Sequence, residues 1–197
     1  VLSGTGTLTK TGNGTLNFSA NNTFSGATVV GAGTLNYSGT VTNTLLLVGN
    51  NSGVAASVNQ TAGNIVINGG AGDCLDVGNI AGAYGYYNAA GGTLTANGIA
   101  VGGENNNGSG FSGTGGDGIM EINGATVNDI GWLVMARGVT AETGILNVFS
   151  GSLAFAGGGL QANWGSGQTS IINLMGGSVS STNVPVNFLN ANNTGIL

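Results

Sequence analysis

The side chains that could carry acid–base chemistry are few. The chain has seven acidic residues, two basic residues and no histidine. A glycoside hydrolase needs two carboxyl groups held several ångströms apart, and a polysaccharide lyase needs a base, usually Arg or Lys, beside acidic calcium ligands. Asp73 and Asp76 are the closest acidic pair, whereas Asp129 and Glu142 are solitary in the sequence. Without a basic residue nearby, the pair is interpreted as a solvated turn, and no enzymatic activity is predicted.

A glycine-rich segment offers one weak candidate for metal binding. Gly113–Ile119 fits most of the glycine–aspartate nonapeptide that binds calcium in β-rolls, with Asp117 as the carboxylate. Sites of that kind take their ligands from consecutive copies, and no second copy follows. We therefore interpret the segment as a glycine-rich loop and predict no metal or other cofactor.

Aromatic side chains are the remaining candidates for binding. Residues 102–118 form a predicted loop insertion, and Phe111 is its one aromatic residue. Insertions on repeat proteins often carry binding, so Phe111 is a candidate contact with a glycan or a neighbouring subunit. The other aromatic residues are expected either to stack inside the fold or to form a surface strip that binds sugars. They are Tyr84, Tyr86, Tyr87, Trp132 and Trp164. At least one of Tyr86 and Tyr87 is expected in the core, because both occupy columns held elsewhere by Ile and Leu.

The charge balance narrows the class of partner. The net charge is −5, and Lys10 and Arg137 are the basic residues, so the chain cannot neutralise a run of phosphates. Nucleic acids and anionic membranes are therefore not expected as partners. The apolar runs are far shorter than a bilayer-spanning helix. Cys74 is predicted to be a small buried hydrophobe beside Leu75, with intermolecular pairing as the alternative.

These side chains belong to an internal repeat. Over residues 57–197, a small residue followed two positions later by an aliphatic one recurs about every 26 to 33 residues. The aliphatic members form the predicted core, with a more N-terminal residue extending the series: Leu35, Ile65, Leu94, Val127, Leu153 and Val179. Four positions before the small residue stand Asn59, Asn88, Asn147 and Asn173, with Glu121 in the same column. Towards the N-terminus the asparagine column is lost from this alignment.

Local patterns indicate the kind of repeat. Short apolar runs such as residues 64–67, 118–122 and 144–148 alternate with period two and are bounded by Gly, Asn or Ser, as β-strands are. Glycine makes up 41 of the 197 residues and opposes long helices. Each repeat holds about three such runs. We predict an all-β fold, one continuous right-handed parallel β-helix over residues 1–197 with about seven or eight coils.

The stacking of coils explains both columns. Equivalent residues of successive coils lie about 4.8 Å apart, so aliphatic side chains form continuous internal columns. Stacked asparagines can donate an amide hydrogen from one coil to the carboxamide of the next, and we expect this ladder to face inward at a turn. Glu121 interrupts it, because a carboxylate has no hydrogen to donate. We expect Glu121 to point outward or to pair locally.

The chain ends inside its own repeat. Residues 194–197 (Thr-Gly-Ile-Leu) repeat residues 143–146, and neither terminus shows the polar cap that a solenoid normally needs. We therefore expect a building element whose partner is itself, through separate copies stacked end to end or through further repeats of one chain.

The N-terminal part resembles a known family. Residues 4–36 contain a doubled Gly-Thr-Leu at Gly6–Leu8 and Gly14–Leu16, the segment Asn22–Gly26 (Asn-Thr-Phe-Ser-Gly), and a closing Ala-Gly-Thr-Leu at Ala32–Leu35. This pattern resembles the autotransporter-associated β-strand repeat of large secreted bacterial surface proteins. The resemblance implies a passenger-type parallel β-helix, extracellular or at the cell surface, with no catalytic residues to carry over.

Three functional hypotheses follow. The first is a structural, non-catalytic segment of an extracellular bacterial fibre or surface protein. The second is an adhesin passenger that binds glycans or surfaces. The third is an ice-binding solenoid, suggested by threonine runs such as Thr5 with Thr7 and Thr40 with Thr42. It ranks last, because the alignment shows no threonine recurring in register in the later repeats.

Overall fold

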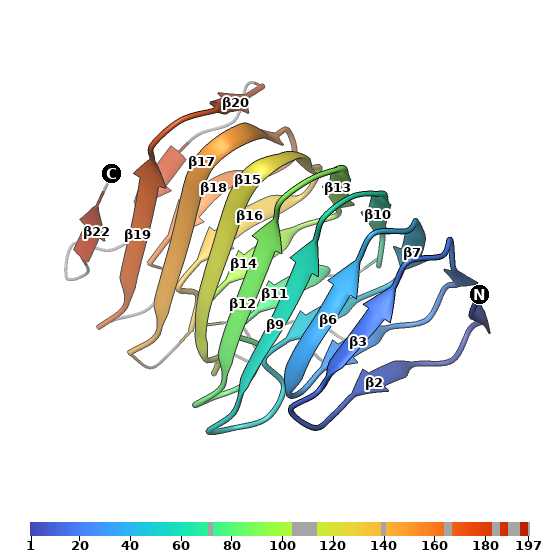
Figure 1. The fold of residues 1–197 in the computed structure, drawn as a ribbon. Coiled ribbons are helices and arrows are strands. Elements are labelled where there is room, and N and C mark those ends of the chain that lie inside the picture. The colour runs from blue at the N-terminus through green and yellow to red at the C-terminus, as the bar shows by residue number, and fades with distance from the viewer. Residues whose placement is uncertain are drawn as a thin grey trace.

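The chain winds into a stack of β-coils. The structure, a computed structural model, describes residues 1–70, 73–103, 114–138, 141–163 and 167–182, and the backbone of residues 186–188 and 194–196. Within these ranges all regular elements are strands, and neighbouring strands pair in parallel. The two termini lie at opposite ends of the stack (Figure 1). The predicted all-β solenoid is therefore confirmed.

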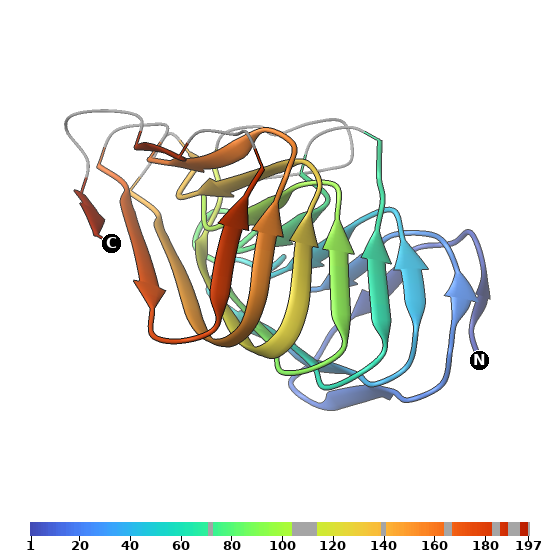
Figure 2. The same cartoon turned by 90° about the horizontal axis from the view of Figure 1, so that it is seen from above.

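The coils form three faces, which Figure 2 shows from above. The first sheet, in chain order, consists of β3 (Thr15–Phe18), β6 (Gly33–Tyr37), β9 (Ala55–Gln60), β12 (Tyr84–Ala89), β15 (Asp117–Asp129), β17 (Thr143–Phe155), β19 (Thr169–Leu174) and β22 (Thr194–Ile196). The second sheet consists of β2 (Leu8–Lys10), β5 (Thr28–Val30), β8 (Leu46–Val48), β11 (Leu75–Val77), β14 (Ile99–Val101), β16 (Trp132–Met135), β18 (Gly159–Ala162) and β21 (Val186–Phe188).

The third face completes each coil. It contains β7 (Val41–Asn43), β10 (Asn64–Ile67), β13 (Thr93–Ala96), the last residues of β15 and β17, and β20 (Ser178–Ser181). The long strands β15 and β17 run from the first sheet around a corner onto this face, with register shifts near Asn123. A separate pair, β1 (Ser3–Gly4) and β4 (Thr23–Phe24), lies near the N-terminus. Three strands per coil agree with the three strand-like runs in each repeat.

Aliphatic columns fill the interior, with one residue from each coil. On the third face the paired residues are Val41, Ile65, Leu94, Val127 and Leu153, all at most 1% exposed. Complete burial of one such side chain contributes about 1.5–3 kcal/mol to folding. Four of the six predicted core residues therefore lie together in this column.

The other two predicted core residues are placed differently. Leu35 is fully buried, but it lies on the first sheet beside Val58, and Val41 holds the place before Ile65. The alignment on small residues fails here because Gly33 begins a first-sheet strand, whereas the matching glycine of the next repeat precedes a third-face strand. Val179 pairs in register with Leu153 but is 39% exposed.

Glycine is required where the chain turns from the first sheet onto the third face. Gly63 and Gly92 have φ values of +78° and +73°, which favour glycine. A Cβ atom on Gly63 would lie 2.1 Å from the carbonyl oxygen of Gly39, and one on Gly92 would lie 2.2 Å from that of Gly63. The corners of successive coils therefore stack glycine on glycine.

Candidate functional site

A column of amide side chains runs along the outer surface of the first sheet. Its members, in register from coil to coil, are Asn17, Asn36, Asn59, Asn88, Glu121, Asn147 and Asn173. Near the N-terminus, Asn36 Nδ2 donates to Asn17 Oδ1 at 2.7 Å and Asn59 Nδ2 donates to Asn36 Oδ1 at 3.1 Å. Near the other end, Asn173 Nδ2 donates to Asn147 Oδ1 at 2.7 Å. The four asparagines singled out in the sequence belong to this column.

The ladder differs from its prediction in two respects. It continues into the N-terminal coils through Asn36 and Asn17, where the sequence alignment lost it. It also faces outward from the middle of the strands and not inward at a turn. Asn59 stands between Val58 and Gln60, which are fully buried, and alternate residues of a strand face opposite sides. Asn17 is exposed, and the later amides of the column are half-buried because each covers part of the next.

Glu121 breaks the ladder. Its Oε1 accepts a hydrogen bond from Asn147 Nδ2 at 3.2 Å, and its Oε2 accepts one from the Tyr86 hydroxyl at 2.7 Å. A carboxylate cannot donate to the preceding coil, and Asn88 Oδ1 there is a buried atom without a hydrogen-bond partner among the described residues. Burial, together with the bond to Glu121, raises the pKa of Tyr86 to about 12, so this phenol stays neutral.

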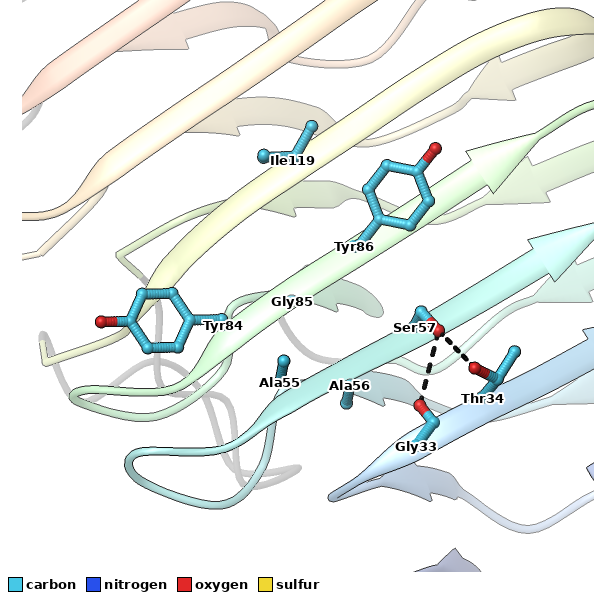
Figure 3. A pocket seen from close by; sticks show the side chains of 9 residues that line it. All are labelled: Gly33, Thr34, Ala55, Ala56, Ser57, Tyr84, Gly85, Tyr86 and Ile119. Carbon is cyan, nitrogen blue, oxygen red and sulfur yellow. Dashed lines mark hydrogen bonds between the residues drawn. The ribbon is translucent and has the colours of Figure 1, made fainter. Parts of the chain in front are cut away.

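A groove lies beside the ladder on the same outer surface. Figure 3 shows Tyr84 and Tyr86 projecting from β12, with Ala55 and Ser57 on the neighbouring strand β9. The groove has a volume of about 350 Å³, and none of its nine lining residues is charged. Tyr84 is 54% exposed. Tyr87 points the other way, is fully buried, and donates from its hydroxyl to Gln60 Oε1 at 2.8 Å, so one of the adjacent tyrosines lies in the core as predicted.

Threonines recur in register on the first sheet, which the sequence alignment did not show. Thr143 pairs with Thr169, and Thr169 pairs with Thr194. The column does not continue, because the preceding coils place Asp117 and Tyr84 at this position. This column therefore covers three successive coils, and the other threonine pairs in register, Thr15 with Thr34 and Thr93 with Thr126, each cover two.

The Asp73–Asp76 pair is not a solvated turn. Asp73 is 3% exposed and Asp76 is fully buried. Arg137 Nη1 lies 3.2 Å from Asp73 Oδ2, so the one arginine of the chain forms an ion pair with a residue 64 positions earlier. Coil stacking brings the two together, which corrects the prediction that no basic residue is near.

Asp129 and Glu142 are likewise not solitary. Asp129 is 1% exposed, and its Oδ1 accepts backbone hydrogen bonds from Gly98 at 3.1 Å and Gly131 at 3.0 Å. Its Oδ2 is buried and has no hydrogen-bond partner among the described residues. Burial raises the pKa of Asp129 to about 7, and the charge of Asp73 acts in the same direction. Glu142 is 3% exposed and accepts from Gln168 Nε2 at 3.4 Å.

Cys74 lies inside the coil stack. It is fully buried, as the sequence predicted, and its thiol donates to the carbonyl oxygen of Gly69 at 3.1 Å. Burial, reinforced by the charge of Asp73, raises the pKa of the thiol to about 11. A buried, neutral thiol is a packing group and not a nucleophile.

The calcium candidate has a structural use. Asp117 Oδ1 accepts a hydrogen bond from the backbone amide of Thr143 on the next coil at 2.8 Å. In the part of the chain that the structure describes, no three His, Cys, Asp or Glu side chains come together to hold a metal ion. Phe111 and most of the predicted loop insertion, and also Trp164, lie outside the described residues.

Comparison with known families identifies the N-terminal coils. The family model of the Passenger-associated-transport-repeat matches residues 8–36. These residues are similar to a passenger-associated transport repeat. This confirms the resemblance seen in residues 4–36, and the matched residues build β2 to β6. No curated protein and no solved structure matches the chain.

The matched repeat links residues 8–36 to a known class of bacterial passenger. Such repeats occur in the passengers of bacterial autotransporters, which are secreted or exposed at the cell surface and are generally non-catalytic. The described residues include no helix long and apolar enough to cross a membrane. Asn17 and Asn36 lie within the matched repeat, so the outer ladder begins in it and extends over the following coils.

Proposed function

We propose that this segment is a structural, non-catalytic part of an extracellular bacterial fibre or surface protein, and that its end coils stack on neighbouring coils. The observation that supports the proposal is the change in burial along the internal columns. Their residues are completely buried in the middle of the stack, whereas apolar side chains are exposed at both of its ends. Another coil on each end would cover them.

The N-terminal end is partly open. Val1 and Leu2 are 87% and 43% exposed. They border a hollow of about 400 Å³ together with Leu8, Leu16 and Phe18. Leu16 heads the first-sheet column that continues as Leu35, Val58 and Tyr87, yet it is only half-buried. A coil placed over it would extend the column by one layer.

Lysine covers one edge of this end. Lys10 heads a second-sheet column and is 8% exposed. Its Nζ donates to the carbonyl oxygens of Thr11, Gly12 and Ala32 at 3.0, 2.6 and 2.9 Å. The aliphatic part of Lys10 lies over Val30 while its charge is satisfied by the turn. Lys10 therefore places a polar side chain over one apolar column at this end.

Apolar side chains are also exposed towards the C-terminal end. Leu174 and Met175 are each 58% exposed, and Val179 is 39% exposed. An apolar cavity of about 100 Å³ lies behind Leu174 and Val179. Full burial of an exposed leucine contributes about 1.5–3 kcal/mol of favourable free energy. An added coil would bury several apolar side chains at this end and would also pair with its strand edges.

Sedimentation velocity of two matched variants tests the stacking. Leu174→Lys places a charge on the C-terminal end, and Ile130→Lys places one on the side of the stack, where Ile130 is 53% exposed. The proposal expects the wild-type segment to associate with rising concentration, Leu174→Lys to remain monomeric, and Ile130→Lys to behave like the wild type. Equal association of both variants would refute stacking through this end.

The other two hypotheses have different support. A glycan-binding passenger is the second candidate, because the outer surface of the first sheet carries the tyrosine groove. Ice binding remains third. Its threonine column covers three coils, and the next outward column there holds Ile145 and Ile171 in place of a second threonine row.

A further inference from the structure

We propose that the groove beside Tyr84 and Tyr86 binds a neutral oligosaccharide. The groove lies on the side of the coil stack, away from the end coils that the proposed function uses. Each proposal can therefore be refuted without affecting the other. The lining comes from β6, β9, β12 and β15, and the argument rests on its shape, its aromatic wall and its lack of charge.

The groove exists because side-chain size changes abruptly between two coils. Tyr84 pairs in register with Ala55, and Tyr86 pairs with Ser57. The small residues continue one coil further, where Ser57 pairs with Thr34. Two tyrosine rings therefore stand beside a low floor of small side chains. The volume of about 350 Å³ lies within the range of ligand pockets.

The wall presents two aromatic surfaces at a fixed spacing. Tyr84 and Tyr86 are two residues apart on one face of a strand, which separates their Cα atoms by about 7 Å. Tyr86 is anchored, because its hydroxyl donates to Glu121 Oε2 at 2.7 Å, whereas Tyr84 is 54% exposed. The C–H face of a pyranose ring packs on such a ring through dispersion and its attraction to the aromatic quadrupole. Four strands span about 14 Å, which accommodates a short oligosaccharide.

The floor supplies hydroxyl groups of the kind that sugars bind. Thr34 Oγ1 lies 2.9 Å from Ser57 Oγ, and Ser57 Oγ donates to the carbonyl oxygen of Gly33 at 3.5 Å (Figure 3). Hydroxyl oxygens with two lone pairs can still accept a hydrogen bond from a ligand. None of the lining residues is charged, so nothing in the groove would offset the desolvation of an anionic or cationic ligand. This chemistry favours a neutral saccharide.

A peptide ligand fits the groove less well. Peptides often bind by adding a strand to an open sheet edge, but β6, β9, β12 and β15 are consecutive members of one sheet. Their backbone groups already pair with one another. A proline-rich peptide could still pack on the tyrosines without strand addition, and it is therefore included as a competitor in the test.

Calorimetric titration with neutral hexasaccharides, namely cellohexaose, maltohexaose and chitohexaose, tests the proposal on the whole segment. At least one of them should bind, and Tyr84→Ala should weaken it by about tenfold through loss of one stacking surface. Ser57→Tyr should abolish binding by filling the floor while leaving both wall tyrosines in place. Trp132→Ala removes another exposed aromatic, 42% exposed and on a different sheet, and should leave binding unchanged.

Several results would overturn the proposal. These are the absence of heat with every neutral hexasaccharide, unchanged affinity in both Tyr84→Ala and Ser57→Tyr, or binding of a polyproline peptide with no saccharide binding. Preference for polygalacturonate, an anionic polymer, would also contradict it. Saccharide binding by a segment that stays monomeric would leave this proposal intact while refuting stacking.

Discussion

Replacement of Asp129 by asparagine should stabilise the protein at neutral and alkaline pH. The Asp129 carboxyl is 1% exposed, and burial raises its pKa to about 7 from a model-peptide value of 3.8. Oδ1 is used by the amides of Gly98 and Gly131, whereas Oδ2 is buried without a hydrogen-bond partner among the described residues. Asparagine keeps the accepting oxygen and removes the charge.

The sign and size follow from proton linkage. Between pH 4 and pH 7 the folded chain holds a proton on Asp129 that the unfolded chain has released, so the free energy of unfolding falls as pH rises. Each pH unit in this window removes about 1.4 kcal/mol, and the loss levels off above the folded-state pKa. From pH 4 to pH 8 the stability of Asp129→Asn relative to the wild type should rise by about 3–4 kcal/mol.

Urea unfolding at several pH values measures this difference, and Asp129→Ala is its control. Alanine also removes the titration but leaves the amides of Gly98 and Gly131 without their acceptor, so it should be less stable than Asp129→Asn throughout. Two results would refute the conclusion that burial of the Asp129 carboxylate destabilises the folded protein. These are an equal pH dependence in wild type and Asp129→Asn, and a loss of stability in Asp129→Asn at pH 8.

The ladder and the corners give two further predictions. In a Tyr86→Phe background, Glu121→Asn should raise the free energy of unfolding by about 1–2 kcal/mol, because it gives Asn88 Oδ1 a donor; an unchanged urea midpoint would contradict this. Gly63 and Gly53 both have positive φ values, +78° and +73°. A Cβ atom on Gly63 would lie 2.1 Å from a backbone oxygen, whereas one on Gly53 would have no atom within 4 Å. Thermal melts should therefore show a greater loss for Gly63→Ala than the roughly 1–2 kcal/mol expected at Gly53, and equal losses would show that the corners are not close-packed.

The architecture was predictable because its cause is local and repeated. Period-two alternation specifies strands, and recurrence of Ile65, Leu94 and Val127 at one column specifies coils that stack in register. The outward face of the ladder was also predictable in principle, since Asn59 stands between two residues that face inward. The prediction that the ladder faces inward at a turn did not take this alternation into account.

The N-terminal register was harder to predict. A small residue two positions before an aliphatic one occurs both at first-sheet strands, as at Gly33, and at third-face corners, as at Gly63. The pattern alone does not distinguish the two. Pairing of Asn36 with Asn59 and of Val41 with Ile65 distinguishes them, and that pairing depends on the length of each coil.

The buried charges and the groove could not be predicted from local sequence. Arg137 meets Asp73 across 64 residues because intervening coils have particular lengths. The groove depends on a register that sets Tyr84 beside Ala55. Both are properties of stacking between coils, and a single sequence gives coil lengths only to within several residues.

Negative-stain electron microscopy of the isolated 197-residue chain tests the central claim most directly. If the exposed apolar residues at the two ends are surfaces for neighbouring coils, the chain should form unbranched rods many segments long, and Leu2→Lys with Leu174→Lys should reduce these to single segments. Uniform short rods of one segment at every concentration, unchanged in the double variant, would contradict the account.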